Sequence, residues 1–305
     1  MADLLERKLI VVTGKGGVGK STIAAALGIL AARGGRRTIL VEVGGQRQLP
    51  RLLGHGQPPP IGNEVEVTDR LWTVTADPER ALTDWLAGAA GRLPARFLTS
   101  RTSFQYFAAA APGAGELLNM IKVADLARRS GRRGGYDLVI LDAPATGHAL
   151  AMLASPQTFT TIVRGGPMAA KAHEVQALLD DPQRSGYLAV CQSNELAVSE
   201  TLELAQSLSA KTGRQLEAVA VNCAYSRRFS AAELERLGQL DGELPAVRNA
   251  VSAAHTVNER ARLQARQLAR LRRAKLPVVS VPFIFEHRLE RRALERVADH
   301  LARKL

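Results

Sequence analysis

One stretch of the sequence, "GKGGVGKST" at residues 14–22, has the residue types that hold phosphate groups. It fits the pattern G-x-x-x-x-G-K-[ST] at every fixed position. Glycines allow backbone N–H groups to turn toward phosphate oxygens, and the first turn of a following helix adds a partial positive charge. We therefore predict a nucleotide site here. The residues that would contact the nucleotide are Gly14, Lys15, Gly16, Gly17, Val18, Gly19, Lys20, Ser21 and Thr22.

Three side chains could serve the chemistry of a bound triphosphate. Lys20 would contact the β- and γ-phosphates, and the Ser21 hydroxyl would bind Mg²⁺. Asp142 follows a run of apolar residues, where it could hold the water shell of Mg²⁺ or accept a hydrogen bond from Ser21. As an isolated residue it could equally cap a helix. We expect ATP or ADP with Mg²⁺ as ligands, Lys20 and Asp142 as catalytic residues, and Ser21 with Asp142, through water, as the metal site.

A phosphate loop needs a strand before it and a helix after it, and both are predicted. Residues 8–13 ("KLIVVT") read as a strand, and residues 21–34 ("STIAAALGILAARG") read as a helix. Further apolar, β-branched runs alternate with longer helical patterns, which is typical of parallel strands joined by helical crossovers. The other predicted strands cover residues 37–43, 71–77, 136–144, 187–192, 216–222 and 276–283.

These elements predict an α/β fold: a doubly wound, mostly parallel sheet flanked by helices, with ligands at the carboxyl ends of the strands. We expect one domain over residues 1–305, because a second nucleotide-binding half would need a second glycine-rich loop. Helical additions are expected around residues 78–133 and 156–181, irregular or helical structure at 45–70, and a final helix at about 288–305.

The composition is that of a globular protein, with 46% hydrophobic and 23% charged residues. No apolar run is long enough to cross a bilayer, and the first residues do not resemble a signal peptide. We expect a cytoplasmic protein, either free or peripherally associated with a membrane. The two cysteines, Cys191 and Cys223, are far apart, so no zinc site is expected within the chain.

The net charge of +12 comes largely from residues 258–275, which contain seven basic residues and one acidic residue. Read as a helix, this stretch has arginines at i, i+4 spacing, with the leucines Leu263, Leu268 and Leu271 elsewhere on its surface. It could meet nucleic acid, an anionic membrane or an acidic subunit, but a solvated face is the favoured interpretation. Nucleic acid is disfavoured as a partner because no aromatic residues interleave the charges.

Lys15 has two readings. A phosphate loop does not need it, so it could be a solvated lysine. Alternatively, "KGGVGKS" resembles the deviant Walker A loop of a group of dimeric ATPases that includes partition, division-site-selection, nitrogenase-iron-protein and arsenical-pump types. In that group the early lysine reaches the nucleotide of the partner subunit. The resemblance implies that Lys15 is a catalytic residue, which would neutralise transition-state charge only when two subunits close.

"LDAPATGHAL" at residues 141–150 resembles the second switch of arsenical-pump and tail-anchored-protein-targeting ATPases, D-T-A-P-T-G-H. Asp142, Thr146, Gly147 and His148 hold the same places, with Pro144 inside the segment. Gly147 would let the segment approach the γ-phosphate and move on hydrolysis. His148 is either a switch residue or a histidine at the start of a helix.

Other stretches extend this resemblance over nearly the whole chain. Residues 109–118 look like the A-P-G-x-x-E segment of the family, and Asn222 looks like the asparagine that reads the adenine edge. Residues 281–290 resemble the closing segment, which implies that Pro282 and Phe283 lie near the base. Glu200 also matches a family position, where a structural role is implied.

The first switch departs from the family pattern. The family has D-P-A-H after its second strand, and its aspartate positions the attacking water. Here alignment on Leu49 puts Gly44 in that place, and the nearest carboxylate is Glu42. Either Glu42 substitutes as a catalytic residue, a partner supplies the group, or hydrolysis is slow. The zinc-binding CxxC of the targeting ATPases and an evident groove for a tail anchor are also absent.

The resemblance implies a dimeric, ATP-hydrolysing switch protein with an unknown client protein or membrane partner. The dimer could be a homodimer or a heterodimer with a related ATPase subunit. Because of Gly44, a weakly hydrolysing or inert regulatory subunit is the alternative. A partition-type ATPase that binds DNA or membrane is less favoured, because the second-switch segment fits the arsenical-pump pattern better.

Overall fold

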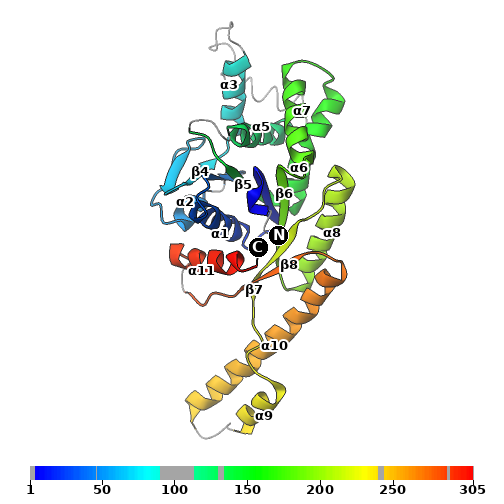
Figure 1. Cartoon of the computed structure of the whole chain (residues 1–305). Helices are drawn as coiled ribbons and strands as arrows, with labels where there is room; N and C mark the ends of the chain where they lie inside the picture. The colour runs from blue at the N-terminus through cyan, green and yellow to red at the C-terminus, as the bar shows by residue number, and fades with distance from the viewer. Residues whose placement is uncertain are drawn as a thin grey trace.

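The computed structural model describes residues 4–45, 47–89, 113–129, 134–239, 244–286 and 289–304. Its centre is an eight-stranded sheet with the order β3-β4-β2-β5-β1-β6-β7-β8 (Figure 1). The strands are β1 (Leu9–Gly14), β2 (Thr38–Glu42), β3 (Val65–Thr68), β4 (Leu71–Thr75), β5 (Leu138–Ala145), β6 (Ser185–Gln192), β7 (Ala218–Ala224) and β8 (Val278–Pro282).

Helices connect the strands and cover both faces of the sheet. They are α1 (Lys20–Arg33), α2 (Leu49–Leu52), α3 (Pro78–Ala89), α5 (Ala114–Arg128), α6 (Thr146–Ile162), α7 (Pro167–Asp180), α8 (Glu195–Thr212), α9 (Ala231–Gln239), α10 (Pro245–Arg273) and α11 (Arg291–Ala302). A 3₁₀ turn at Leu4–Glu6 precedes β1. In Figure 1, α1 and α11 lie together on one side of the sheet, and α6, α7 and α8 lie on the other. The predicted doubly wound α/β fold is confirmed.

Two of the inner strands, β1 and β2, are buried along their whole length. Every residue of β1 and of β2 is buried, which explains their continuous apolar sequences, because helices cover both faces of the sheet. Their burial makes the sheet the hydrophobic core, to which α1 contributes Ile23 and Leu27 with no exposed surface. The core therefore holds the two ends of the phosphate loop, β1 and α1, in place.

All strand pairs except β3–β4 are parallel, so the carboxyl ends of seven strands share one edge of the sheet. Val12 of β1 is in register with Asp142 of β5, and Glu42 of β2 is in register with the same aspartate. The antiparallel strand β3 lies within residues 45–70, for which the sequence predicted irregular or helical structure. Its short run of alternating residues was too weak a signal, and the pairing with β4 stabilises it.

The helical additions α3, α5, α6 and α7 lie together at the top of Figure 1, on the side of the sheet opposite α1 and α11. α3 and α5 fall within the predicted 78–133, and α7 with the end of α6 fall within 156–181. Residues 90–112 and 130–133, including the first four residues (109–112) of the predicted A-P-G segment, lie outside the described residues. None of the helices in the described ranges is long and apolar enough to cross a membrane.

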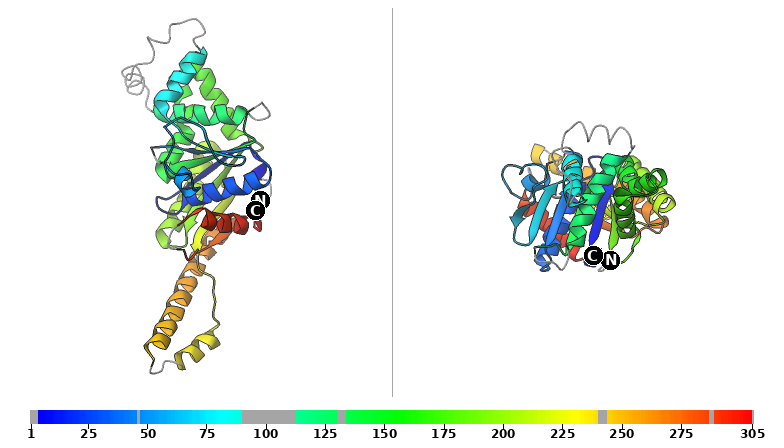
Figure 2. Two further views of the ribbon diagram at one scale, coloured as in Figure 1. Left: turned by 90° about the vertical axis from the view of Figure 1, so that its left-hand side faces the viewer. Right: turned by 90° about the horizontal axis from the view of Figure 1, so that it is seen from above.

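Helices α9 and α10 leave the sheet between β7 and β8 and project away from it (Figures 1 and 2). The basic stretch is helical, as predicted, because residues 258–273 belong to α10. The placement of Leu271 on the surface is wrong: its side chain has no exposed surface, and Leu268 packs against the core, whereas Leu263 is 58% exposed. The reason is that the last turns of α10 contact α8 and β8.

This difference along α10 predicts the effect of two matched substitutions. Leu271→Ala should lower the free energy of unfolding by about 2–5 kcal/mol, because it empties a packed site. Leu263→Ala, in the same helix, should change it by less than about 0.5 kcal/mol, because its side chain is exposed. Urea unfolding followed by circular dichroism measures both. Equal effects of the two substitutions would contradict the packing of α10 described above.

Candidate nucleotide site at the phosphate loop

The loop between β1 and α1 has a backbone shape that requires glycine at two positions. Gly14 has φ 143°, and a Cβ there would lie 2.2 Å from the carbonyl oxygen of Val190 on β6. Gly19 has φ 95°, and a Cβ there would lie 2.2 Å from Nδ2 of Asn222 on β7. Side chains would therefore clash at both ends of the loop and would strain its backbone. The loop is packed against the neighbouring strands rather than free.

Lys20 lies at the first position of α1 and points back over the loop. Its ammonium group donates a hydrogen bond of 3.0 Å to the carbonyl oxygen of Lys15. Burial lowers the pKa of Lys20, and the nearby charge of Asp142 partly restores it. The helix start and this cation together form the positive environment expected for phosphate groups.

Ser21 and Asp142 meet as the sequence predicted. The Ser21 hydroxyl donates a hydrogen bond of 2.5 Å to Oδ2 of Asp142. The second carboxylate oxygen, Oδ1, is buried and has no hydrogen-bond partner within the described part of the chain. Burial raises the pKa of Asp142 to about 6, while the Ser21 hydrogen bond and the charge of Lys20 lower it. A buried carboxylate with a free oxygen is a group that a cation would stabilise.

These residues fit a nucleotide with Mg²⁺. A hard cation prefers oxygen ligands and keeps several waters, and Ser21 Oγ and Asp142 supply such oxygens side by side. Thr146 Oγ1 at the start of α6 is also buried, with no hydrogen-bond partner among the described residues. Ser21 would bind the cation directly and Asp142 would hold its water shell. When bound, the cation would supply charge neutralisation for the triphosphate.

Lys15 forms an ion pair with Glu200 of α8 in the same chain. The two side chains remain 30% and 32% exposed. They line a cavity of about 440 Å³ together with Gly16 and with Thr146 and Gly147 of the second-switch segment. His148, next in sequence, is exposed. The structure thus brings the early lysine, the second-switch glycine and Glu200 to one cavity, and leaves His148 at the surface.

Glu42, the nearest carboxylate to the altered first switch, is buried beside Asp142. Its Oε1 accepts hydrogen bonds of 2.8 and 3.0 Å from the backbone N–H groups of Gln48 and Leu49, which caps the short helix α2. Oε2 is buried with no hydrogen-bond partner in the ranges that the structure describes. Burial raises the pKa of Glu42 to about 7, against the lowering effect of the two backbone donors. Gly44 is exposed and has φ 77°.

Asn222 is buried at the end of β7 and holds the phosphate loop. Its side-chain nitrogen donates a hydrogen bond of 3.0 Å to the carbonyl oxygen of Val18. Its side-chain oxygen accepts one of 2.9 Å from the backbone nitrogen of Cys223. An amide has two N–H donors and two lone pairs, so one of each remains for a base. The adenine-reading role of Asn222 stays a prediction.

An aromatic cluster lies beside Asn222, and the sequence interpretation found only part of it. Phe283, which follows Pro282 at the end of β8, stacks on Tyr225 with ring centroids 5.1 Å apart and contacts Phe285 at 4.8 Å. Gln264 of α10 binds the backbone of Tyr225 at 2.7 Å. Tyr225 and Phe285 were missed, although each lies within three residues of a predicted contact. This closeness in sequence to Asn222 and Phe283 is the signal that could have predicted them.

The comparisons with known proteins agree with this site. The family model described as anion-transporting ATPase matches residues 7–165, which include the phosphate loop and the second-switch segment. The chain is 33% identical over 212 residues to ATPase BagA of Mycobacterium tuberculosis, covering 66% of this chain and 61% of that protein. It is 27% identical to ATPase GET3 of Candida glabrata, covering 66% of this chain and 68% of that protein.

A putative arsenical pump-driving ATPase of Halobacterium salinarum is 26% identical to 71% of this chain. Only 35% of that relative is covered, and the alignment with the mycobacterial ATPase spans less than two thirds of the relative's length. The chain therefore spans only part of the length of these relatives.

The buried carboxylate of Glu42 predicts how stability depends on pH. The unfolded chain ionises Glu42 near its ordinary pKa of 4.5, whereas the folded chain retains the proton up to about pH 7. Between pH 4.5 and about pH 7, Glu42 is therefore protonated in the folded state and ionised in the unfolded state. Because the folded state binds more protons, the free energy of unfolding falls as pH rises through this range. In metal-free protein, Glu42→Gln should reduce that fall by about 2–3 kcal/mol.

Glutamine is the matched replacement because its side-chain oxygen can still accept the hydrogen bonds from Gln48 and Leu49. Urea unfolding at a series of pH values from about 4.5 to 7 measures the effect. A wild-type chain whose stability is constant or rises across this range, with the same profile for the variant, would contradict the assigned environment of Glu42.

Proposed function

The chain belongs to the anion-transporting ATPase family, and from this premise we propose that it is an Mg²⁺-dependent ATP-binding protein that works as a dimeric switch. The observation that supports this proposal most is the phosphate loop in which the Ser21 hydroxyl donates a hydrogen bond of 2.5 Å to Asp142. ATP binding would close two subunits, and closure would create or remove a surface for a client. The second subunit would be a copy of this chain or a related ATPase.

Within this proposal the residues divide the work. The loop N–H groups and Lys20 bind the β- and γ-phosphates, and Ser21 and Asp142 hold the hydrated cation. Asn222 and the ring of Phe283 would contact the base. Gly147, which lines the cavity with Lys15, would move with the γ-phosphate. Lys15 would contact the partner's nucleotide.

The proposed role of Lys15 requires that it leave Glu200 when subunits close. Their ion pair is about one third exposed on both sides, and a pair of this kind is worth only about 0–1 kcal/mol. Breaking this ion pair to form a contact with phosphate would therefore cost little free energy. Glu200 would hold the lysine in the open state, so that it does not fold onto its own loop.

We also propose that the chain alone hydrolyses ATP slowly. Gly44 stands where a water-positioning aspartate is expected. The neighbouring Glu42 is engaged with the backbone of α2 and buried, so it is poorly placed to orient a water. Loss of a positioned base costs about 10²–10⁴-fold in rate. This favours a slow switch or a regulatory subunit that depends on a partner over a fast autonomous ATPase.

Two lysine substitutions test the dimeric switch. Lys20→Ala should weaken ATP binding at least about tenfold, because a charged contact to phosphate is lost. Lys15→Ala should keep ATP affinity within about threefold of wild type and lose ATP-dependent dimer assembly, because its contact would be made across the interface. Fluorescent-nucleotide titration and sedimentation velocity with and without ATP give the two readouts.

Lys304→Ala, an exposed lysine at the far end of the chain, serves as the control for charge alone. If Lys15→Ala assembles like the wild type, or if the wild-type chain does not assemble with ATP either alone or mixed with a related ATPase subunit, the dimeric role of Lys15 is wrong.

A second pair of variants tests the slow hydrolysis. Gly44→Asp should raise the turnover of ATP by the isolated chain at least about tenfold, because it restores a carboxylate at the first switch. Asp and Asn both tolerate positive φ, and apart from the two adjoining residues no atom of the described chain lies within 4 Å of a Cβ at this position. Gly44→Asn is therefore the matched control, for which no increase is expected. Brisk turnover by the wild-type chain alone would refute the proposal.

A further inference from the structure

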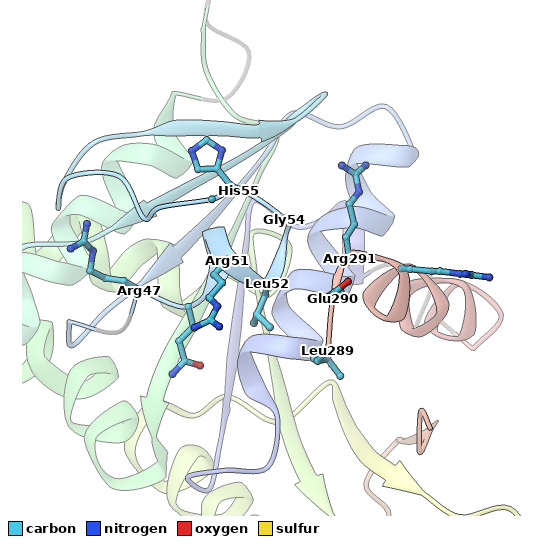
Figure 3. Close-up of a pocket in the computed structure, with 11 residues that line it drawn as sticks. Arg47, Arg51, Leu52, Gly54, His55, Leu289, Glu290 and Arg291 are labelled. Carbon is cyan, nitrogen blue, oxygen red and sulfur yellow. The ribbon is translucent and has the colours of Figure 1, made fainter. Parts of the chain in front are cut away.

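A second cavity, of about 910 Å³, lies between the α2 segment and the start of α11. Figure 3 shows Arg47, Arg51 and His55 on one wall, with Arg291 coming from the facing segment. Cavities that hold small ligands have volumes of about 300–1,000 Å³. The size of this cavity therefore suits a small molecule.

The lining of this cavity carries strong positive charge. Arg47, Arg51, Arg291 and Arg292 contribute four guanidinium groups, and Glu290 is the one carboxylate among the lining residues. Guanidinium groups repel one another where they gather, and the repulsion is relieved when an anion lies between them. The charge therefore indicates an anionic ligand.

Two of the arginines are held in position by the protein. Arg47 donates hydrogen bonds to the carbonyl oxygens of Pro58, at 2.9 Å, and Pro59. Arg291 binds Glu295 at 3.2 Å and the Thr68 hydroxyl at 3.3 Å. These hydrogen bonds orient the two guanidinium groups, one on each wall of the cavity.

The side chains of the other two arginines have N–H donors that are free to bind a ligand. The side chains of Arg51 and Arg292 are exposed and have no hydrogen bond or ion pair with any residue that the structure describes. In addition, Nε of Arg47 is buried with no hydrogen-bond partner in the same part of the chain. Arginine forks bind carboxylate and phosphate groups through paired N–H donors, so these unoccupied donors match an anion with several oxygens.

This cavity is separate from the phosphate loop. Its lining includes Arg47 and Gln48 of the first-switch stretch, but none of its described lining residues belongs to the phosphate loop, to the second-switch segment or to the aromatic cluster. The buried residues Leu49 and Pro50 of α2 lie on the core side, whereas Arg51 lines the cavity. The α2 segment, which Glu42 caps from within, thus separates the two sites.

We propose that this arginine-lined cavity is a binding site for a small polyanion, a metabolite that carries two or more phosphate or carboxylate groups. The lining residues within the described ranges include no Phe, Tyr or Trp, so they offer no platform on which a nucleobase would stack. It also exposes few apolar side chains for a lipid tail, since Leu52 and Leu289 are the only two leucines among the lining residues. These features select a compact, multiply charged ligand.

Calorimetric titration of the chain saturated with ADP, in about 150 mM salt, tests the proposal. Inorganic pyrophosphate and citrate are the two probes, and they distinguish a phosphate ligand from a carboxylate ligand. ADP fills the phosphate loop, and salt at this level screens weak exposed charges. We expect at least one probe to bind at one site per chain. Arg51→Gln with Arg292→Gln should weaken that binding at least about tenfold.

Arg227→Gln with Arg236→Gln removes the same charge from two exposed arginines outside the cavity, so it controls for net charge. This pair should bind the probe as the wild type does. The proposal is overturned if neither probe binds, or if the two double variants lose affinity equally. Circular dichroism of each variant confirms that it is folded before the titration is interpreted.

Discussion

The parallel register between β1 and β5 is the constraint on which the site depends. It pairs Val12 with Asp142, so that the carboxylate emerges beside the loop that starts two residues later. The first turn of α1 then places Ser21 within 2.5 Å of that carboxylate. A shift of one residue would turn Asp142 to the other face of the sheet. Burial of both strands on both faces resists such a shift, because every apolar side chain would move with it.

The same packing holds the loop in a shape suited to phosphate before any ligand arrives. The glycines at its two ends fit against Val190 on β6 and Asn222 on β7, and Lys20 bonds back to the carbonyl oxygen of Lys15. Little ordering remains to oppose binding, which is the energetic advantage of a preorganised site. The cost is a set of buried polar atoms without partners, including Oδ1 of Asp142. A hydrated cation and a triphosphate would satisfy them.

Much of the fold and of the phosphate site could be predicted from the sequence, because both depend on local patterns. Continuous apolar runs indicated the inner strands, and the spacing of glycines, Lys20 and Ser21 indicated the loop. Features set by distant contacts could not be predicted. Glu42 caps α2 because the chain turns back on β2, and Leu271 is buried because α10 ends against α8 and β8. The cavity lined by Arg51 and Arg292 joins segments about 240 residues apart, a distance that no local pattern bridges.

The central claim is that Ser21 and Asp142 form the cation part of an ATP site. The dependence of ATP affinity on Mg²⁺, measured for the wild type and for Asp142→Asn, tests it most directly. We predict that Mg²⁺ tightens ATP binding by the wild type at least about tenfold, and that this gain is largely lost in the variant while its metal-free affinity is retained. An equal gain from Mg²⁺ in both proteins would contradict the assignment of this pair.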